Sequence, residues 1–289
     1  MKPFDVFLAI LVALIWGLNF VAIKIGLNEF PPFLLSGLRF LFAAFPAVLI
    51  VKRNKTPWKY IVAIGVSVGI VMFSLLFIGM EAGLSTGLTS LVLQIQAPFT
   101  LLISAIYLKD KPSRIQLSGV LLAFTGILLL AVSNESTIST LGLLLVILSG
   151  LSWAISNIIM KKAGKINMLS LIVWMSLIPP IPLLMISFFF ETNQLEVLSN
   201  LSAKGIGAIL YMSLFSTILA YGLWAKLLKD YKPNIVAPFS LLIPIFGIYS
   251  SIILLGEKMS LTEVISSVIV FAGLVSVVFG ERIIKIFKN

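Results

Sequence analysis

One stretch of this sequence occurs twice. Residues 14–24 read LIWGLNFVAIK, and residues 151–161 read LSWAISNIIMK. The two copies align in an aromatic residue, a polar residue and a cation, namely Trp16 with Trp153, Asn19 with Ser156 and its neighbour Asn157, and Lys24 with Lys161. A repeat displaced by about half the chain predicts two copies of one folding unit, which we divide into residues 1–135 and 136–289.

The repeats lie in a chain that is apolar over most of its length. Of the 289 residues, 60% are hydrophobic and 11% are charged, and the mean hydropathy of +1.13 is far above that of soluble domains. Apolar stretches of about 20 residues, enough for a helix to cross roughly 30 Å of hydrocarbon, follow one another along the chain. We expect ten spans, at residues 4–23, 32–51, 60–79, 84–108, 115–132, 141–160, 169–190, 205–225, 235–255 and 261–279. The sequence therefore predicts an all-α membrane protein with ten transmembrane helices embedded in the lipid bilayer.

The distribution of Lys and Arg predicts the orientation of these helices. Of the 21 such residues, all but Lys24, Arg39, Lys204 and Lys258 fall on the side of the membrane that also holds both termini. By the positive-inside rule that side is the cytoplasm. Each half contains an odd number of spans, so the second half must enter the membrane upside down relative to the first. Two inverted five-helix repeats can exchange conformations, which is the geometric basis of alternating access.

The inversion also relates charged residues near the two membrane surfaces. The cytoplasmic sequence LKDKPS at residues 108–113 reappears outside as LGEKMS at residues 255–260, so that Asp110 aligns with Glu257. In the same way, Lys24 on the outer side is the image of cytoplasmic Lys161. The exceptions to the positive-inside pattern thus follow from the repeat.

The residue types that are missing from the sequence narrow its function. There are no cysteines and no histidines, which excludes disulfides, thiolate metal sites and the commonest acid–base residue, so we predict no catalytic residue, metal or cofactor. No nucleotide-binding P-loop occurs, so ATP does not drive the protein directly. No Asp or Glu lies well within a span, which favours a facilitator or exchanger over a proton-coupled pump. The net charge of +10 reflects membrane orientation, so no nucleic-acid partner is predicted.

Five segments carry a resemblance to a known family. They are WGLNFVAIKIGL at 16–27, PPFLLSGLRF at 31–40, GLTSLVLQIQAPF at 87–99, SWAISNIIMKK at 152–162 and VAPFSLLIPIFG at 236–247. In these segments the chain resembles the EamA-type transporters of the drug/metabolite transporter superfamily, and at 169–174 and 221–224 it is similar to the members that export cysteine and O-acetylserine. The resemblance implies a non-enzymatic, multi-pass transporter of the bacterial cytoplasmic (inner) membrane that exports small amino acids or metabolites.

Polar and aromatic residues inside the spans are the candidate solute-binding residues, because such residues are costly in a bilayer and face a cavity or another helix. They are Trp16, Asn19, Arg39, Gln94, Gln96, Ser156, Asn157, Trp174 and Tyr221. Arg39 lies about 10 Å below the outer interface, where it either binds a carboxylate or caps the carbonyl groups of a broken helix. Paired amides and aromatic rings from both halves suit a zwitterionic solute, although the same side chains also serve helix packing.

The fourth span needs a finer prediction, since its two glutamines point in different directions on a helix. At most one of them is expected to meet the solute. Gln94 follows a stripe of small residues that favours packing against a neighbouring helix, so Gln96 is the freer of the two. Prolines within the spans predict breaks in the helices, because proline cannot donate the usual hydrogen bond; they are Pro98, Pro179, Pro180, Pro182, Pro238 and Pro244.

Three other functions remain open at this stage. An exporter of larger aromatic or cationic compounds is still a transporter, but a cationic solute would favour a buried carboxylate. A membrane-embedded enzyme would need clustered acids, histidines or metal ligands, and a channel would need a continuous polar stripe along several helices. The sequence offers none of these features, so we favour a permease for small zwitterions.

Overall fold

The computed structural model describes residues 1–53, 55–133, 138–164 and 167–287, and this part of the chain is helical apart from its connecting loops. Within it, ten segments are long and apolar enough to cross a membrane. They are Pro3–Leu27, Pro32–Ile50, Trp58–Glu81, Thr86–Tyr107, Arg114–Val132, Thr140–Ala163, Met168–Phe190, Ala203–Asp230, Ala237–Leu255 and Leu261–Gly280. The prediction of an all-α protein with ten spans is confirmed. The predicted boundary between residues 135 and 136 lies outside the described residues.

Some spans are single helices and others are interrupted. The uninterrupted ones are α1 (Pro3–Leu27), α8 (Arg114–Val132), α9 (Thr140–Ala163) and α17 (Leu261–Phe287). The interrupted ones consist of α2 (Pro32–Ala44) and α3 (Ala47–Ile50); α4 (Trp58–Ile64), η1 (Gly65–Met72) and α5 (Phe73–Glu81); α6 (Thr86–Val92), η2 (Leu93–Ile95) and α7 (Gln96–Tyr107); α10 (Met168–Met175) and α11 (Pro180–Phe190); α13 (Ala203–Leu210), η3 (Tyr211–Leu219) and α14 (Ala220–Asp230); and η4 (Ala237–Leu241) and α16 (Leu242–Leu255). Two short helices lie outside the spans, α12 (Gln194–Ser199) and α15 (Pro233–Val236).

The interruptions fall at matching places in the two halves. The third and eighth spans each contain a π-helical segment, η1 and η3, and the fourth and ninth each contain a 3₁₀ turn, η2 and η4. In both of the latter spans the helix that follows has a proline as its third residue, Pro98 in α7 and Pro244 in α16. Proline is tolerated in a first turn, where its missing N–H would have no helical partner, but it cannot continue the preceding helix. The predicted breaks at these prolines are therefore observed.

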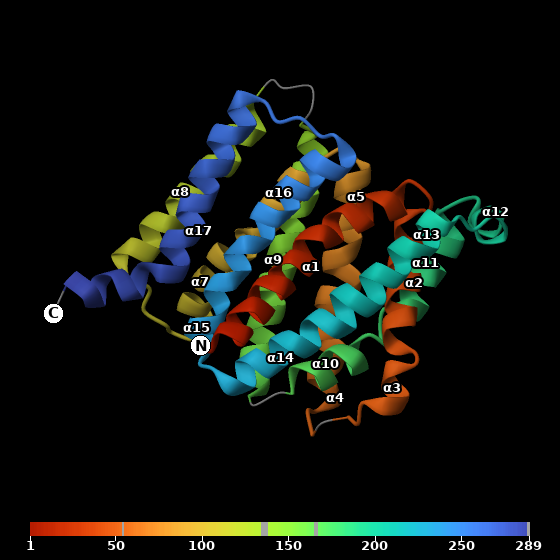
Figure 1. Cartoon of the computed structure of the whole chain (residues 1–289), viewed down its shortest axis with the longest axis horizontal. Helices are drawn as coiled ribbons and strands as arrows, with labels where there is room; N and C mark the ends of the chain where they lie inside the picture. The colour runs from red at the N-terminus through yellow and green to blue at the C-terminus, as the bar shows by residue number, and fades with distance from the viewer. Residues whose placement is uncertain (54, 134–137, 165–166, 288–289) are drawn as a thin grey trace.

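The first helix of each half packs mainly against helices of the other half. α1 packs against α13, η3, α14 and α16 of the second half, and Figure 1 shows it lying between α14 and α16. The equivalent helix α9 packs against α4, η1, α5 and α7 of the first half. The core therefore consists of two bundles of mixed origin, one built around α1 and the other around α9.

Side chains of the exchanged helices bond to the π-helical segments. A π-helical turn leaves backbone carbonyl groups without their usual partner. Trp16 Nε1 in α1 donates to the carbonyl oxygen of Ser216 in η3 at 3.0 Å. On the other bundle, Ser152 Oγ in α9 donates to the carbonyl oxygen of Ser67 in η1 at 2.7 Å. These bonds hold each exchanged helix to the half that received it.

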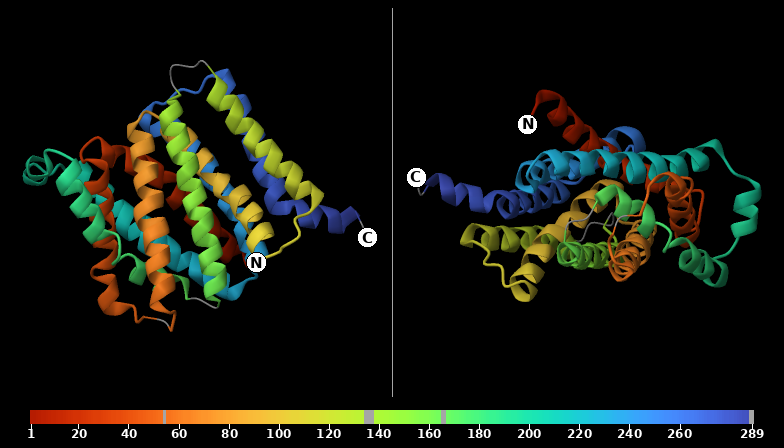
Figure 2. Two further views of the ribbon diagram at one scale, coloured as in Figure 1. Left: turned by 180° about the vertical axis from the view of Figure 1, so that it is seen from behind. Right: turned by 90° about the horizontal axis from the view of Figure 1, so that it is seen from below.

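The fifth and tenth spans stand apart from these bundles. Figures 1 and 2 show α8 and α17 side by side at one edge of the molecule. Their backbones meet closely at glycines: a β-carbon on Gly273 would lie 2.5 Å from the backbone nitrogen of Ala123, and one on Gly126 would lie 2.6 Å from Val270 Cγ2. A larger residue at either position would force the two helices apart.

Candidate solute-binding site

A cavity of about 200 Å³ lies between the two mixed bundles. Toward the ends of its helices that are predicted to face outward, it begins at Arg39, Phe73 and Leu76. At its other limit it reaches Met160 and Met168, at the cytoplasmic ends of α9 and α10. Among the described residues, none at the outer end of a span lines it. The cavity therefore extends to the cytoplasmic ends of its helices and is closed toward the outside.

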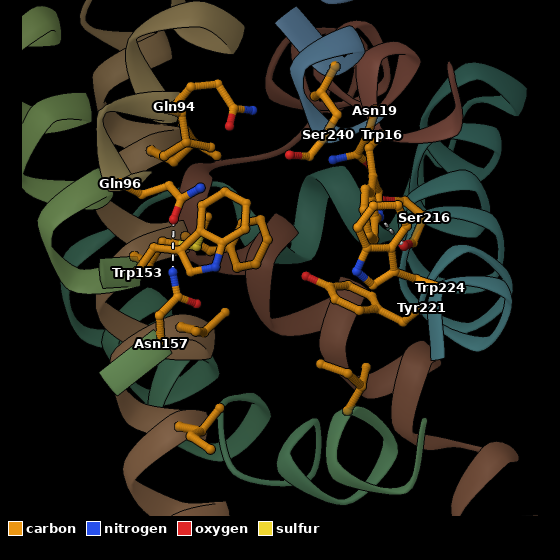
Figure 3. Close-up of a pocket in the computed structure, with 18 of the residues that line it drawn as sticks. Trp16, Asn19, Gln94, Gln96, Trp153, Asn157, Ser216, Tyr221, Trp224 and Ser240 are labelled. Carbon is orange, nitrogen blue, oxygen red and sulfur yellow. Dashed lines mark hydrogen bonds between the residues drawn. The ribbon is translucent and has the colours of Figure 1, made fainter. Parts of the chain in front are cut away.

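The polar and aromatic residues of the cavity form two opposing walls (Figure 3). One wall comes from the α1 bundle and contains Trp16, Asn19, Ser216, Tyr221, Trp224 and Ser240. The other comes from the spans around α9 and contains Gln94, Gln96, Trp153 and Asn157. Equivalent residues of the two repeats thus lie on opposite sides of one chamber.

Three aromatic rings form a cluster on the first wall. The ring centroids of Trp16 and Tyr221 are 5.0 Å apart and those of Trp16 and Trp224 are 5.3 Å apart, with an angle of 60° between the ring planes in both pairs. The hydroxyl group of Tyr221 points into the cavity (Figure 3). Such a cluster offers an apolar wall whose ring faces attract a cation.

Amide groups dominate the opposite wall. Asn157 Nδ2 donates to Gln96 Oε1 at 2.8 Å and to Thr100 Oγ1 at 3.1 Å, which orients both amides. Gln94 also lines the cavity, against the expectation that only one glutamine would do so. The reason is η2: residues two apart differ in direction by about 120° on a 3₁₀ turn and by about 160° on an α-helix. The 3₁₀ turn therefore brings both side chains to the same chamber.

Arg39 lies at the blind outer end of the cavity. Its side chain is 2% exposed, and its Nη2 donates to Thr217 Oγ1 at 3.3 Å. The guanidinium carbon lies 3.9 Å from the ring centroid of Phe73. Nε and Nη1 have no hydrogen-bond partner, and no described carboxylate pairs with them. Across the lining residues, only Arg39 and Tyr221 are ionisable.

Two of the predicted residues do not line the cavity. Ser156 is fully buried and its hydroxyl has no hydrogen-bond partner. Trp174 Nε1 donates to the carbonyl oxygen of Val51 at 2.9 Å, and its ring lies 5.9 Å from that of Trp58. Because successive residues of α9 differ in direction by about 100°, Asn157 and not Ser156 is the counterpart of Asn19 in the cavity. The other predicted residues all line it.

Methionines are among the lining residues that sequence reasoning missed. Four of the nine methionines in the chain line the cavity: Met72, Met160, Met168 and Met175. Their flexible, polarisable side chains adapt to apolar groups of different shapes. In a sequence this apolar, methionine gives no signal that separates a cavity wall from a surface in contact with lipid.

A solute-sized cavity between two inverted five-helix repeats is the arrangement of a secondary transporter. The chain belongs to the EamA-like transporter family, which matches it at residues 4–132 and 140–279. It is therefore a multi-pass membrane transporter and not an enzyme.

Similar proteins are known from several organisms. A protein of Salmonella typhimurium (strain LT2), described as a probable amino-acid metabolite efflux pump, is 40% identical to this chain over 287 residues, which are 96% of each protein. A protein of Escherichia coli (strain K12) with the same description is 37% identical over 292 residues, or 98% of each. One solved crystal structure shares the fold, with a TM-score of 0.68 at 14% identity, and the match covers 96% of this chain and 98% of that one.

Proposed function

We propose that this chain exports small amino acids or their metabolites, such as cysteine or O-acetylserine, across a bacterial cytoplasmic membrane by alternating access. Two relatives that match over their full length are described as probable amino-acid metabolite efflux pumps. The observation that carries the proposal is the cavity, which extends to the cytoplasmic ends of its helices and is closed toward the outside. A cytoplasmic solute enters such an inward-facing conformation, and exchange of conformation between the inverted repeats then releases it outside.

The proposed binding residues are those predicted residues that line the cavity. They are Trp16, Asn19, Arg39, Gln94, Gln96, Asn157 and Tyr221. A mostly apolar chamber with a few polar groups suits a small zwitterion, which needs an orienting contact at each charged end. Ser156 and Trp174 are left out of the proposed site because the one is buried in packing and the other lies beside Trp58.

The test is counterflow of radiolabelled solutes in proteoliposomes that contain the purified chain. Saturable counterflow of cysteine, O-acetylserine or another small amino acid is expected. Asn19→Ala should weaken the apparent affinity about tenfold, because it removes a hydrogen-bonding group from the chamber. Asn28→Ala is the matched control, since Asn28 follows the same helix but lies outside the cavity. Absence of counterflow for every small amino acid would refute the proposed function.

The driving force in this proposal is the gradient of the solute itself. No described Asp or Glu lines the cavity, so the chamber lacks the carboxylate that usually binds and releases a proton. We expect net uptake of the solute into proteoliposomes, measured with an imposed pH gradient, to continue unchanged when a protonophore removes that gradient. Transport that stops under this treatment would show proton coupling and contradict the expectation.

An exporter of larger aromatic compounds is the second candidate. It is favoured by the methionine side chains and by the aromatic cluster of Trp16, Tyr221 and Trp224, which together accommodate flat apolar groups. The same counterflow panel separates the two candidates. Preference for phenylalanine and tryptophan over cysteine and O-acetylserine would support the second.

A further inference from the structure

The blind end of the cavity holds a buried cation that has no anionic partner. Lys161 and Lys226, whose side chains are about half exposed, each pair with a carboxylate, at 2.7 Å and 3.6 Å. Arg39 is almost fully buried within a membrane span, where a charge needs a partner far more, yet two of its three nitrogens have no hydrogen-bond acceptor. The buried charge of Arg39 thus lacks the anionic partner that both of these lysines have among the described residues.

None of the contacts of Arg39 with the described residues Thr217, Phe40 and Phe73 neutralises its charge. The bond to Thr217 Oγ1 is long, at 3.3 Å, and the acceptor is a neutral hydroxyl that also donates to the carbonyl oxygen of Met212 at 2.7 Å. The ring of Phe73 contributes a cation–π contact, which is weaker than pairing with an anion. The two forks of a guanidinium group are its Nε/Nη2 edge and its Nη1/Nη2 edge. Nη2 carries two N–H groups and Thr217 accepts from one of them, so the other N–H and the free nitrogen beside it form a fork that a carboxylate fits with two hydrogen bonds.

We propose that Arg39 binds the carboxylate of the transported solute, so that the cavity selects solutes with a carboxylate group and no net positive charge. This inference rests on the proposed function, because it names the chemical class that the same chamber carries. A solute that enters from the cytoplasm meets Arg39 last, since this residue closes the outer end of the cavity.

The rest of the chamber fits the other end of such a solute. No described carboxylate lines the cavity, so a second positive charge would find no counter-ion there. A single ammonium group can contact the ring faces of the aromatic cluster. A second acceptor is Asn19 Oδ1, which has no donor and is shielded here, so the amide must turn for it to accept from the solute. When an α-amino acid binds in this orientation, its side chain is free to contact the methionines.

The position of Arg39 also links solute binding to both halves of the chain. Arg39 belongs to α2, and its partner Thr217 belongs to η3 in the second half. The free nitrogens are shielded from solvent, with Phe73 beside them, so an arriving carboxylate must displace a neighbouring side chain. Binding therefore rearranges the contact between α2 and η3 at the closed end of the cavity.

The test measures how strongly the purified full-length chain prefers acids over amides. Ligand-induced thermal shift is recorded for cysteine, O-acetylserine, leucine and phenylalanine, and for the carboxamides of leucine and phenylalanine. Wild type should bind each acid at least about tenfold more tightly than its carboxamide. Arg39→Gln should lower acid affinity by about tenfold or more and leave carboxamide affinity within about threefold, so that the preference disappears.

Two variants separate binding from a purely structural role. Arg39→Lys keeps the charge without the fork and should retain part of the acid preference. Thr217→Val removes the hydrogen bond of Arg39 to the protein and should leave the acid preference intact. If Arg39→Gln does not fold, the ratio of acid to carboxamide affinity is compared between wild type and Arg39→Lys. A lower ratio in Arg39→Lys supports the role of Arg39, and an unchanged ratio contradicts it.

The outcomes for the inference and for the proposed function differ. Equal binding of acids and carboxamides by wild type, or an unchanged preference in Arg39→Gln, would overturn the role of Arg39 while leaving export intact. Absence of binding and counterflow for the whole panel would overturn the exporter itself.

Discussion

The outer and cytoplasmic ends of this transporter are related by the repeat but are held together by different interactions. At the outer end, the carboxylate of Glu257 accepts hydrogen bonds from the backbone N–H groups of Thr86 and Gly87, at 2.8 and 3.0 Å, where α6 begins. At the cytoplasmic end, its counterpart Asp110 accepts from Lys161 Nζ at 2.7 Å, and the two side chains are 48% and 56% exposed. Lys24, the counterpart of Lys161, makes no ion pair with a described residue.

Close backbone contacts hold α1, α6 and α16 together, with Gly17 and Gly247 near the middle of their spans. A β-carbon on Gly17 would lie 2.5 Å from Phe246 Cβ, and one on Gly247 would overlap Ser90. These contacts bring α1, α6 and α16 together where the cavity is absent. A carboxylate bound to a helix start together with packed backbones is a stronger link than an ion pair between solvated side chains. We infer that the outer end is the more strongly held of the two, which agrees with a cavity that extends to the cytoplasmic ends of its helices.

The largest expected effect comes from removing Glu257. Glu257→Ala deletes two charge-assisted hydrogen bonds at the outer end and should raise the population open to the outside about 10- to 100-fold. Because the chain has no cysteine of its own, Ser90→Cys reports this opening through its rate of labelling by an impermeant maleimide added outside. Glu196→Ala, which removes an exposed outer carboxylate, is the matched control. Equal labelling in the presence and absence of Glu257 would contradict the inference that this carboxylate holds the outer end together.

A smaller effect is expected from overpacking the outer contact. Gly247→Ala forces a methyl group against Ser90 and should destabilise the closed packing by about 1–3 kcal/mol, seen as a lower melting temperature of the purified protein. Ser90→Gly creates the missing space, so the double variant should be more stable than the sum of the two single changes predicts. Strictly additive effects would mean that the two residues do not meet.

Asp110→Asn should have a weaker effect than Glu257→Ala. The Asp110–Lys161 pair is exposed to solvent, and such pairs contribute little, so accessibility at the cytoplasmic end should change by less than about fivefold. Labelling of Ser240→Cys, a cavity residue in η4, measures this change in inside-out vesicles. A change as large as that caused by Glu257→Ala would mean that the interactions at both ends are equally strong.

Mild acid should have no effect at the cytoplasmic end. Hydrogen bonds from Lys161 and from the hydroxyl of Ser104 lower the pKa of Asp110 below its ordinary value of 3.8. The stabilisation from this carboxylate is therefore fully present above that ordinary value and is lost only as the pH falls through the lowered pKa. Labelling of Ser240→Cys, corrected for the pH dependence of the thiol reaction, should be the same at pH 7 and pH 5. A clear rise at pH 5 would show that another group controls this end.

Several candidate residues could be predicted from the sequence because a polar side chain within a span is costly unless it faces a cavity or another helix. Trp16, Asn19, Arg39 and Tyr221 were predicted as polar or aromatic residues within spans, and each lines the cavity. The sequence did not distinguish Ser156 from Asn157, since adjacent residues of a helix differ only in direction. That choice depends on how α9 is rotated against its neighbours.

The sequence by itself determined the ten spans, their orientation and the inversion of the halves. These conclusions follow from the length of the apolar stretches, the placement of Lys and Arg, and the odd number of spans per repeat. Such properties act through the membrane and do not depend on how the helices pack. Only the tertiary structure decided that α1 and α9 change places between the halves, that η2 directs both Gln94 and Gln96 into one chamber, and that Arg39 is left without a counter-ion. These features arise from contacts between segments far apart in the chain, or from local turns that such contacts stabilise, and no local pattern in the sequence encodes them.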